Sequence, residues 1–266
     1  MPSASTTVIL EWTFTPITYF EEPLQLPTDR GIIHIGEGKV EARFDATVYD
    51  QDPSIRQRLH DQVLSIFRGA QLTNQKPYKL AEQSTVIRLE PDGRRSVSRE
   101  IRGRVTVIIG HAPDIRITDK DGNVVRDSRR DRIEARRRLA ELARRHDADP
   151  LAPSLLESFE TAMNDPPNEL VHLYEIRDAL KKKFRTACKA RTALGISGRK
   201  WDRLGGLADT LPLRQGRHRG RHTGALRDAT EAELADARAI ARSMIEAYLN
   251  YLERPRRVDD GRPCVG

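Results

Sequence analysis

The first half of the chain alternates between apolar and polar residues in the manner of β-strands. In residues 40–48 an apolar residue occupies every second position, and charged residues or threonine stand between them. A similar alternation runs through residues 8–13. Side chains of a strand point alternately to opposite faces, so this pattern predicts strands with one buried face. Further strands are expected in five segments separated by turn sequences such as Pro91-Asp92-Gly93, namely 85–90, 96–101, 105–109, 115–117 and 124–125.

One segment of this half repeats at helical spacing instead. Apolar residues recur three or four positions apart from Ile55 to Phe67, and the pattern ends near Gly69. This spacing places the apolar side chains on one face of a helix. We therefore expect residues 1–125 to form a β-rich domain, an antiparallel sheet or sandwich that carries one helix.

After residue 125 the helical period dominates. Residues 126–165 are highly charged with a thin apolar stripe, which predicts a solvated helical connector followed by a short helix at Ser154–Met163. Three helical regions are expected in residues 166–254, namely a long helix over about Leu170–Phe184, one or two short helices within Ala190–Leu207, and a final helix opened by the capping-box sequence Thr230-Glu231-Ala232-Glu233. The polar tail, residues 255–266, is expected to be disordered. The predicted fold class is α+β, with a C-terminal helical bundle.

Charge divides the chain in the same way. Residues 1–125 hold 16 Lys or Arg against 17 Asp or Glu, whereas residues 126–266 hold 30 against 22. The imbalance is concentrated in Arg177–Arg227, with 15 basic and 3 acidic residues. Solvated surfaces usually mix the two signs, so this segment predicts an anionic partner, with an ordinary charged surface as the alternative. RNA or another nucleic acid is the partner that we expect.

Composition and motifs exclude several other classes. The two cysteines, Cys188 and Cys264, provide neither a disulfide framework nor a metal-ligand cluster, which favours a reducing, cytoplasmic setting. No apolar stretch is long enough to cross a bilayer, and Met1–Trp12 lacks the pattern of a signal peptide. The segment Gly195–Lys200 lacks the Gly-Lys-Ser/Thr ending of a nucleotide-binding loop. We expect no membrane partner, no metal and no cofactor.

The candidate chemistry lies in residues 213–224, which we expect to form a loop before the last helix. This segment interleaves arginines with two histidines, His218 and His222, and three glycines. Arginine offers paired donors that match phosphate oxygens, and histidine exchanges protons near neutral pH. Glycine lets the backbone approach a ligand closely. These are the groups needed to hold a phosphodiester and move protons around it.

Arg217 and His222 are separated by four residues, with the polar His218 directly after the arginine. This Arg-x4-His motif, placed between helices and shortly before a terminal amphipathic helix, resembles that of the HEPN superfamily. HEPN domains are small helical bundles common in prokaryotic defence and toxin systems, and many are metal-independent endoribonucleases. The resemblance covers about residues 168–253. It implies that Arg217 and His222 are the catalytic pair, that His218 occupies the polar position, and that two copies form a composite site in a homodimer.

The residue types leave the assignment within the loop open, because Arg219, Arg221 or His218 is an alternative functional member. Nucleic-acid contacts are expected from nine basic residues, Arg214, Arg219, Arg221, Arg227, Lys181, Lys182, Lys183, Arg199 and Lys200. For the three consecutive lysines, a solvated helix face is the alternative.

Two side chains near the basic segment have competing interpretations. Asp178 or Glu175 on the long helix either orients the loop arginines or is an ordinary surface carboxylate. Trp201 is expected to be a core residue in preference to a base-stacking platform.

Two other functions compete with the nuclease. Arg191–Leu207 has the pattern of a helix-turn-helix that presents a short helix to a DNA groove, and this is the alternative among nucleic-acid-binding modules. A protein-interaction subunit of a larger complex is the third interpretation. The neutral first half carries no recognisable chemistry, and we expect it to sense a signal or dock a protein partner.

Overall fold

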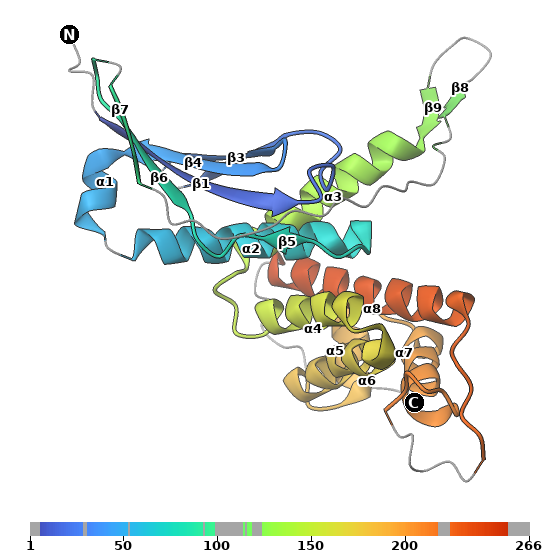
Figure 1. Ribbon diagram of the computed structural model, residues 1–266. Coiled ribbons are helices and arrows are strands. Elements are labelled where there is room, and N and C mark those ends of the chain that lie inside the picture. The colour runs from blue at the N-terminus through green and yellow to red at the C-terminus, as the bar shows by residue number, and fades with distance from the viewer. Residues whose placement is uncertain are drawn as a thin grey trace. The chain divides into compact units, whose positions relative to one another are not determined.

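The computed structural model describes residues 6–28, 31–52, 54–92, 94–98, 114, 116–118, 124–217 and 224–254 (Figure 1). The chain divides into two compact units. The first comprises residues 1–67 and 78–141, and the second comprises residues 68–77 and 142–266. The first unit is built on an antiparallel sheet and the second is helical, so the predicted α+β class is confirmed.

This division differs from the expected one. The boundary falls within helix α3, after residue 141, and not at residue 125. Helix α4 packs against α5 and α8, which places it in the second unit and not in a connector. The physical reason is that α4 (Ala152–Asn164) buries Leu155, Leu156 and Phe159, and a solvated connector has no such core.

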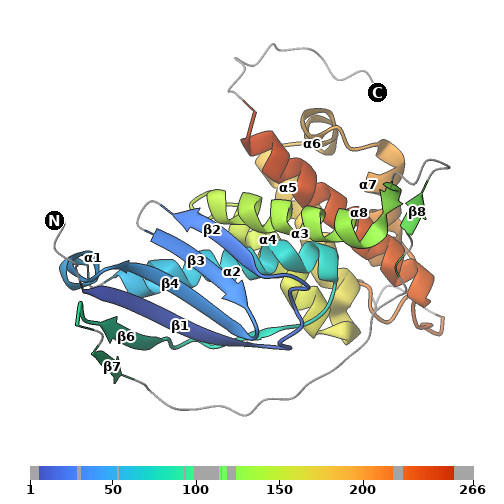
Figure 2. The same cartoon turned by 90° about the horizontal axis from the view of Figure 1, so that it is seen from above.

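The sheet of the first unit has the order β2-β3-β4-β1-β6-β7, and every neighbouring pair is antiparallel (Figure 2). The short strand β5 pairs with the end of β1. The bounds are β1 Thr7–Thr15, β2 Leu24–Thr28, β3 Gly31–Gly36, β4 Lys39–Asp45, β5 Lys79–Leu80, β6 Thr85–Leu89 and β7 Arg95–Ser98. A separate hairpin joins β8 (Arg116–Thr118) to β9 (Val124–Asp127). The strand predicted at 105–109 lies outside the described residues.

The alternating segments predicted from the sequence form the central strands. Leu10 pairs with Ala42 and Trp12 with Val40, and all four side chains are buried. The predicted run to residue 48 is wrong at its end, because β4 stops at Asp45 and helix α1 (Ala46–Gln51) follows. The Asp45 carboxylate accepts a hydrogen bond from the Thr47 N–H, which caps that helix.

Helix α2 (Ile55–Asn74) covers one face of the sheet with the apolar stripe that its sequence predicts. Val63, Ile66 and Phe67 are fully buried, and the Phe67 ring lies edge-on to Phe14 of β1. The helix continues past Gly69, where the sequence predicts its end. Buried side chains further along the helix, such as Leu72, outweigh the low helix propensity of one glycine.

A tight turn at Glu37-Gly38 joins β3 to β4. Both residues have positive φ, 52° and 78°, the combination of a two-residue hairpin turn that matches the twist of its strands. Glycine adopts this conformation without steric cost. A Cβ at residue 38 would also lie 2.7 Å from Cγ2 of Ile17 and would displace that exposed side chain.

Helix α3 (Ser128–Arg145) is more buried than the expected solvated connector. Leu139 and Ala140 are completely buried, and Arg136 is only 5% exposed. Arg132 donates two hydrogen bonds to Glu21, both of 2.8 Å, and Arg136 donates a third of 2.8 Å. These guanidinium groups, Arg132 first, lower the pKa of Glu21 to about 2.

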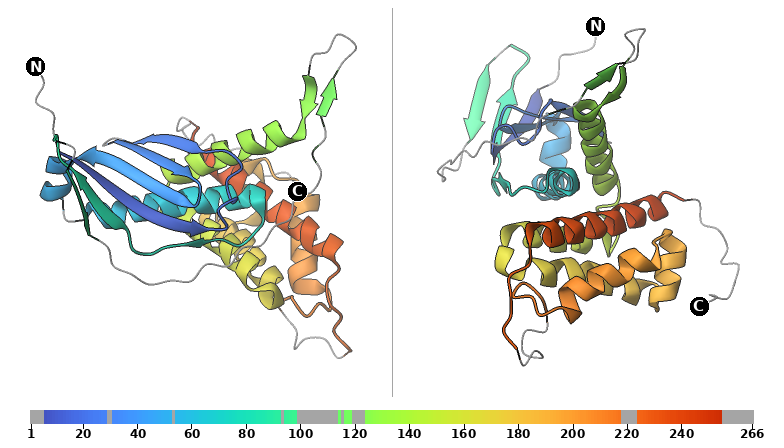
Figure 3. Two further views of the ribbon diagram at one scale, coloured as in Figure 1. Left: turned by 45° about the horizontal axis from the view of Figure 1, so that its top comes forward. Right: turned by 90° about the vertical axis from the view of Figure 1, so that its right-hand side faces the viewer.

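The second unit is a helical bundle in which the last helix packs against α4, α5, α6 and α7 (Figure 3, right, α8 in red). Its elements after α4 are η1 Pro166–Asn168, α5 Glu169–Lys183, α6 Ala187–Leu194, α7 Gly198–Gly205, η2 Gly206–Thr210 and α8 Glu231–Leu252. The predicted capping box at Thr230 and Glu233 is confirmed. Within the described part of the chain, no helix is long and apolar enough to span a membrane.

A buried ion pair joins α5 to α8. Glu169 opens α5 and is 2% exposed, and Arg238 of α8 donates to both of its carboxylate oxygens at 2.6 and 2.8 Å. Since a buried carboxylate is costly without a partner, this contact fixes the relative position of the two helices.

Candidate nucleic-acid site

The loop that carries the candidate chemistry leaves and rejoins the bundle through a stem, which we define as residues 212–217 and 224–229. The two sides of the stem are joined by backbone hydrogen bonds of 3.0 Å, from Arg214 N–H to the Arg227 carbonyl and from Arg227 N–H to the Pro212 carbonyl. The Gln215 side chain accepts a hydrogen bond of 3.0 Å from Ala229 N–H. The two sides of the stem are therefore held together on either side of residues 218–223.

Arg227 connects the stem to the start of α8. Its guanidinium donates to both carboxylate oxygens of Glu233, at 2.8 and 2.6 Å. This contact, followed by the hydrogen bond from the Thr230 N–H, lowers the pKa of Glu233 to about 2. Arg227 was expected to bind nucleic acid, but its donors are directed to a carboxylate within the same unit. Two parallel hydrogen bonds between a guanidinium and a carboxylate are strong and directional, so we interpret Arg227 as a residue that fixes the stem to α8.

Arg217 is the last described residue before the segment that contains the histidines. Its Nη1 donates to Asp178 Oδ2 at 2.8 Å, and its guanidinium lies 5.0 Å from the centre of the Tyr174 ring. Its backbone N–H donates to the Ala208 carbonyl at 2.7 Å. Of the two interpretations of Asp178, this geometry supports the one in which it orients a loop arginine. The hydrogen bond to Asp178 raises the pKa of Arg217, which therefore stays charged.

The guanidinium of Arg177 also lies against the Tyr174 ring. Arg177 lies 5.1 Å from the Tyr174 ring centre and 5.2 Å from that of Trp201. It also donates to the Tyr174 hydroxyl at 2.9 Å and to the Trp201 carbonyl at 3.2 Å. Trp201 is 1% exposed, so its predicted role as a core residue is confirmed. Aromatic rings attract cations, and here they hold two guanidinium groups close together.

A pocket of about 460 Å³ opens beside this cluster. Tyr174 and Arg177 of α5 form one wall, and residues of α7 and η2, among them Asp202, Gly206 and Asp209, form the rest. Tyr174 thus lies both against the pocket and under Arg217. No sequence motif indicated this pocket, because its residues come from segments about thirty positions apart.

The remaining loop candidates, His218, Arg219, Arg221 and His222, lie outside the described residues. Arg214 is described, and its Nη1 lies 3.7 Å from Asp228 Oδ2 on the other side of the stem. Arg217 is therefore the member of the expected catalytic group whose surroundings are described.

A second feature is a cationic surface, which we define as the basic residues of segment 179–201, most of them exposed. This segment contains eight Lys or Arg and neither Asp nor Glu. Among the described residues, none of the eight forms an ion pair.

Five members of the cationic surface were predicted as nucleic-acid contacts, namely Lys181, Lys182, Lys183, Arg199 and Lys200. The other three, Arg185, Lys189 and Arg191, were not among the predicted contacts. The lack of acidic residues between positions 179 and 201 is the signal that identifies the whole segment.

Helices α6 and α7 are joined by a three-residue turn, Gly195–Ser197. Gly195 has a φ of 68°, and the Ser197 side chain caps α7 by accepting a hydrogen bond from Lys200 N–H. Five residues of the two helices and their turn are buried, namely Ala190, Leu194, Ile196, Trp201 and Leu204, and both helices pack against α5 and α8. Two short helices with a glycine-containing turn are the arrangement of a helix-turn-helix. Arg199 and Lys200 lie on the exposed side of α7.

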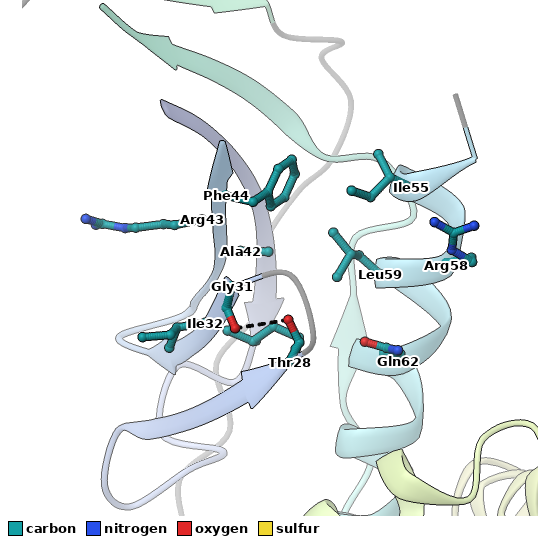
Figure 4. Close-up of a pocket in the computed structure, with 11 residues that line it drawn as sticks. Thr28, Gly31, Ile32, Ala42, Arg43, Phe44, Ile55, Arg58, Leu59 and Gln62 are labelled. Atoms are coloured by element: carbon teal, nitrogen blue, oxygen red, sulfur yellow. Dashed lines mark hydrogen bonds between the residues drawn. The ribbon is translucent and has the colours of Figure 1, made fainter. Parts of the chain in front are cut away.

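The first unit contains a smaller pocket of about 190 Å³ (Figure 4). It lies between α2 and strands β3 and β4, and Phe44 points towards Ile55 while Arg43 points to the other face of the strand. The Thr28 hydroxyl donates to the Gly31 carbonyl at 3.0 Å along its rim. Most of its lining residues are apolar, and Arg58 and Gln62 of α2 are among the polar ones.

Comparisons with known protein families, with curated proteins and with solved structures return no match for this chain. The chemistry of the described residues therefore carries the functional argument.

Proposed function

We propose that this protein is a metal-independent endoribonuclease of the HEPN type, and that Arg217 and His222 form its catalytic pair. The observation that carries the proposal is the setting of Arg217. A loop arginine is directed by a carboxylate and an aromatic ring beside a pocket of the helical bundle, while 42% of its side chain remains exposed. A guanidinium held in this way is positioned to bind a phosphate.

In the proposed reaction the ribose 2′-oxygen bonds to phosphorus as the bond from phosphorus to the 5′-oxygen breaks. His222 acts as general base or general acid, taking the proton from the 2′-hydroxyl or giving one to the leaving 5′-oxygen. Arg217 stabilises the charge that develops on the phosphate oxygens. The products are a 2′,3′-cyclic phosphate and a 5′-hydroxyl. In the HEPN resemblance two copies contribute to one site, so we expect the active form to be a homodimer.

The cationic surface supports an RNA substrate, because unpaired Lys and Arg side chains are available to neutralise phosphates along a strand. Each phosphate contact with single-stranded RNA contributes about −0.7 to the slope of log affinity against log salt concentration. We expect the slope to become less negative by about this amount when Lys182 is replaced by alanine.

The test is cleavage of short single-stranded RNA by purified protein in EDTA, with Arg217→Ala and His222→Ala beside the wild type. Both variants should lose cleavage, while Arg242→Ala, which removes the same charge from α8 away from the loop, should retain it. Cleavage that survives in both loop variants would exclude this pair. RNA that binds in a salt-dependent way but stays intact would favour a binding module.

The second candidate is duplex DNA binding through α6 and α7, which the glycine turn at Gly195 and the exposed basic residues of α7 favour. In this case duplex DNA should bind more tightly than single-stranded RNA of equal length and remain uncut. Arg199→Ala should weaken that binding, because the side chain lies on the exposed face of the second helix. A preference for single-stranded RNA that is unchanged in Arg199→Ala would exclude this function.

A further inference from the structure

The pocket beside Arg217 has the position of a substrate subsite. Arg217 lies over the Tyr174 ring, and Tyr174 also lines the pocket, so a nucleotide whose phosphate meets Arg217 has the pocket next to it. Its volume of about 460 Å³ lies within the range of small-molecule sites.

The backbone of the pocket is shaped by two consecutive glycines and a widened helical turn. The Leu211 N–H donates to the Gly206 carbonyl at 2.9 Å, a bond that spans five residues and defines the π-helical turn η2. Such turns are rare and occur frequently at functional sites. A Cβ on Gly206 would meet no atom within 4 Å, so this glycine leaves room in the pocket that the packing of the bundle does not require.

The polar groups around this space form a pattern of donors and acceptors. Two nitrogens of Arg177 are engaged by Tyr174 and Trp201, whereas Nη2 has no hydrogen-bond acceptor among the described residues. A Cβ on Gly205 would lie 3.3 Å from this Nη2, so a larger residue there would crowd the guanidinium, whose side chain is 16% exposed. The carboxylate of Asp202 is exposed on the same lining.

We infer that this pocket binds a guanine base next to the phosphate that is cleaved, an inference that rests on the proposed ribonuclease function. Guanine presents O6 and N7 as acceptors, which arginine recognises, and its N1–H and 2-amino group as donors, which a carboxylate recognises. Arg177 supplies the donor and Asp202 the acceptor. Uracil has a similar pair of groups in O4 and N3–H but lacks N7 and the 2-amino group, so it can make only part of these contacts. Adenine and cytosine carry an amino group where guanine has O6, so they place a donor against Arg177.

The experiment replaces Gly206 by leucine, which adds an apolar side chain to the pocket lining at a position where a Cβ meets no atom within 4 Å. Cleavage is measured in EDTA on short RNAs of equal length that differ in one base. The wild type should cut the guanine-containing RNA on the order of tenfold or more faster in kcat/KM than its adenine, cytosine and uracil counterparts. In Gly206→Leu the rate on guanine should fall to that on the other bases, and Gly206→Ala, which adds one methyl group, should keep most of the preference.

Equal wild-type rates on all bases would overturn the guanine pocket and leave the ribonuclease function intact. If the wild type cuts no RNA, binding of guanosine 5′-monophosphate measured by calorimetry tests the pocket separately. Binding to the wild type that is lost in Gly206→Leu and weakened in Asp202→Asn supports it. Binding no tighter than that of adenosine or uridine 5′-monophosphate, or unaffected by Gly206→Leu, overturns it.

Discussion

Replacing Asp178 by asparagine separates the positioning of Arg217 from the stability of the bundle. The substitution keeps the shape of the side chain and removes the charge that accepts the 2.8 Å hydrogen bond. The side chains of Arg217 and Asp178 are 42% and 41% exposed. Exposed ion pairs contribute about 0–1 kcal/mol, because solvent screens them, so the free energy of unfolding should change by less than about 1 kcal/mol.

Activity should respond much more strongly than stability. Misplacement of a catalytic group by about 1 Å costs on the order of 10²-fold in rate. Since the Tyr174 ring still contacts the guanidinium in Asp178→Asn, we expect a loss in kcat/KM on the order of tenfold to a hundredfold. The assay is the initial rate of RNA cleavage in EDTA, measured beside urea unfolding followed by circular dichroism.

A matched control comes from another exposed ion pair of the same unit. Arg145 donates to Glu253 at 2.6 Å, and the two side chains are 44% and 34% exposed; His146 Nε2 lies 2.7 Å from the other oxygen of the same carboxylate. Glu253→Gln should lose a similar small amount of stability and retain cleavage. The reasoning is refuted if Asp178→Asn cleaves RNA at the wild-type rate, or if its unfolding free energy falls enough to account for the lost activity.

Three further predictions concern the fold. Glu169→Ala leaves Arg238 largely buried without its main partner and should lower the free energy of urea unfolding by about 3 kcal/mol. The pKa of Glu21, depressed from 4.5 to about 2, gives stability that is present above pH 4.5 and lost as the pH falls towards 2. Glu21→Gln should remove this acid dependence. The part of the unfolding free energy that depends on it is about 3 kcal/mol, and solvent screens it little because the side chain is only 12% exposed. Gly31→Ala places a Cβ on the Arg43 carbonyl oxygen and should cost about 1–3 kcal/mol in the same assay.

Each of these has an outcome that contradicts it. Glu169→Ala with wild-type stability would show that the buried pair is replaceable by solvent, and the double variant with Arg238→Met should recover part of the loss. Parallel acid-unfolding curves for Glu21→Gln and the wild type would contradict the Glu21 assignment. Unchanged stability in Gly31→Ala would mean that strands β3 and β4 separate easily at that point.

The parts of the fold that could be predicted depend on local chemistry. The capping box at Thr230 lies entirely within four residues, so the start of α8 follows from sequence alone. The end of β4 was mispredicted because Thr47 and Val48 continue the alternation, while the choice of helix depends on the Asp45 cap. The extent of α2 beyond Gly69 depends on burial of Leu72, a tertiary property that the apolar pattern up to Phe67 did not contain.

The candidate site was predictable in its residue types and less so in its pairings. Residue types predicted Arg217 as a candidate in the loop, and Asp178 or Glu175 on the long helix as its partner; the structure shows that Asp178 accepts its hydrogen bond. It also gave Arg227 as a nucleic-acid contact, although Glu233, six positions away, accepts both of its hydrogen bonds. The pocket at Gly206 was not predictable, because it depends on a π-helical turn that brings residues of α7 and η2 towards α5.

The stem that closes the loop has a consequence for how the loop can vary. Arg214, Gln215 and Arg227 hold the two sides of the stem together. The entropy of closing a chain segment between two joined ends rises only with the logarithm of its length. Doubling the length of a flexible loop costs only about 0.6 kcal/mol of closure entropy. Residues inserted between 217 and 224 would therefore leave the bundle, the stem and Arg217 nearly as stable as before. The reach of the loop towards a substrate can change by insertion or deletion while its anchor stays the same.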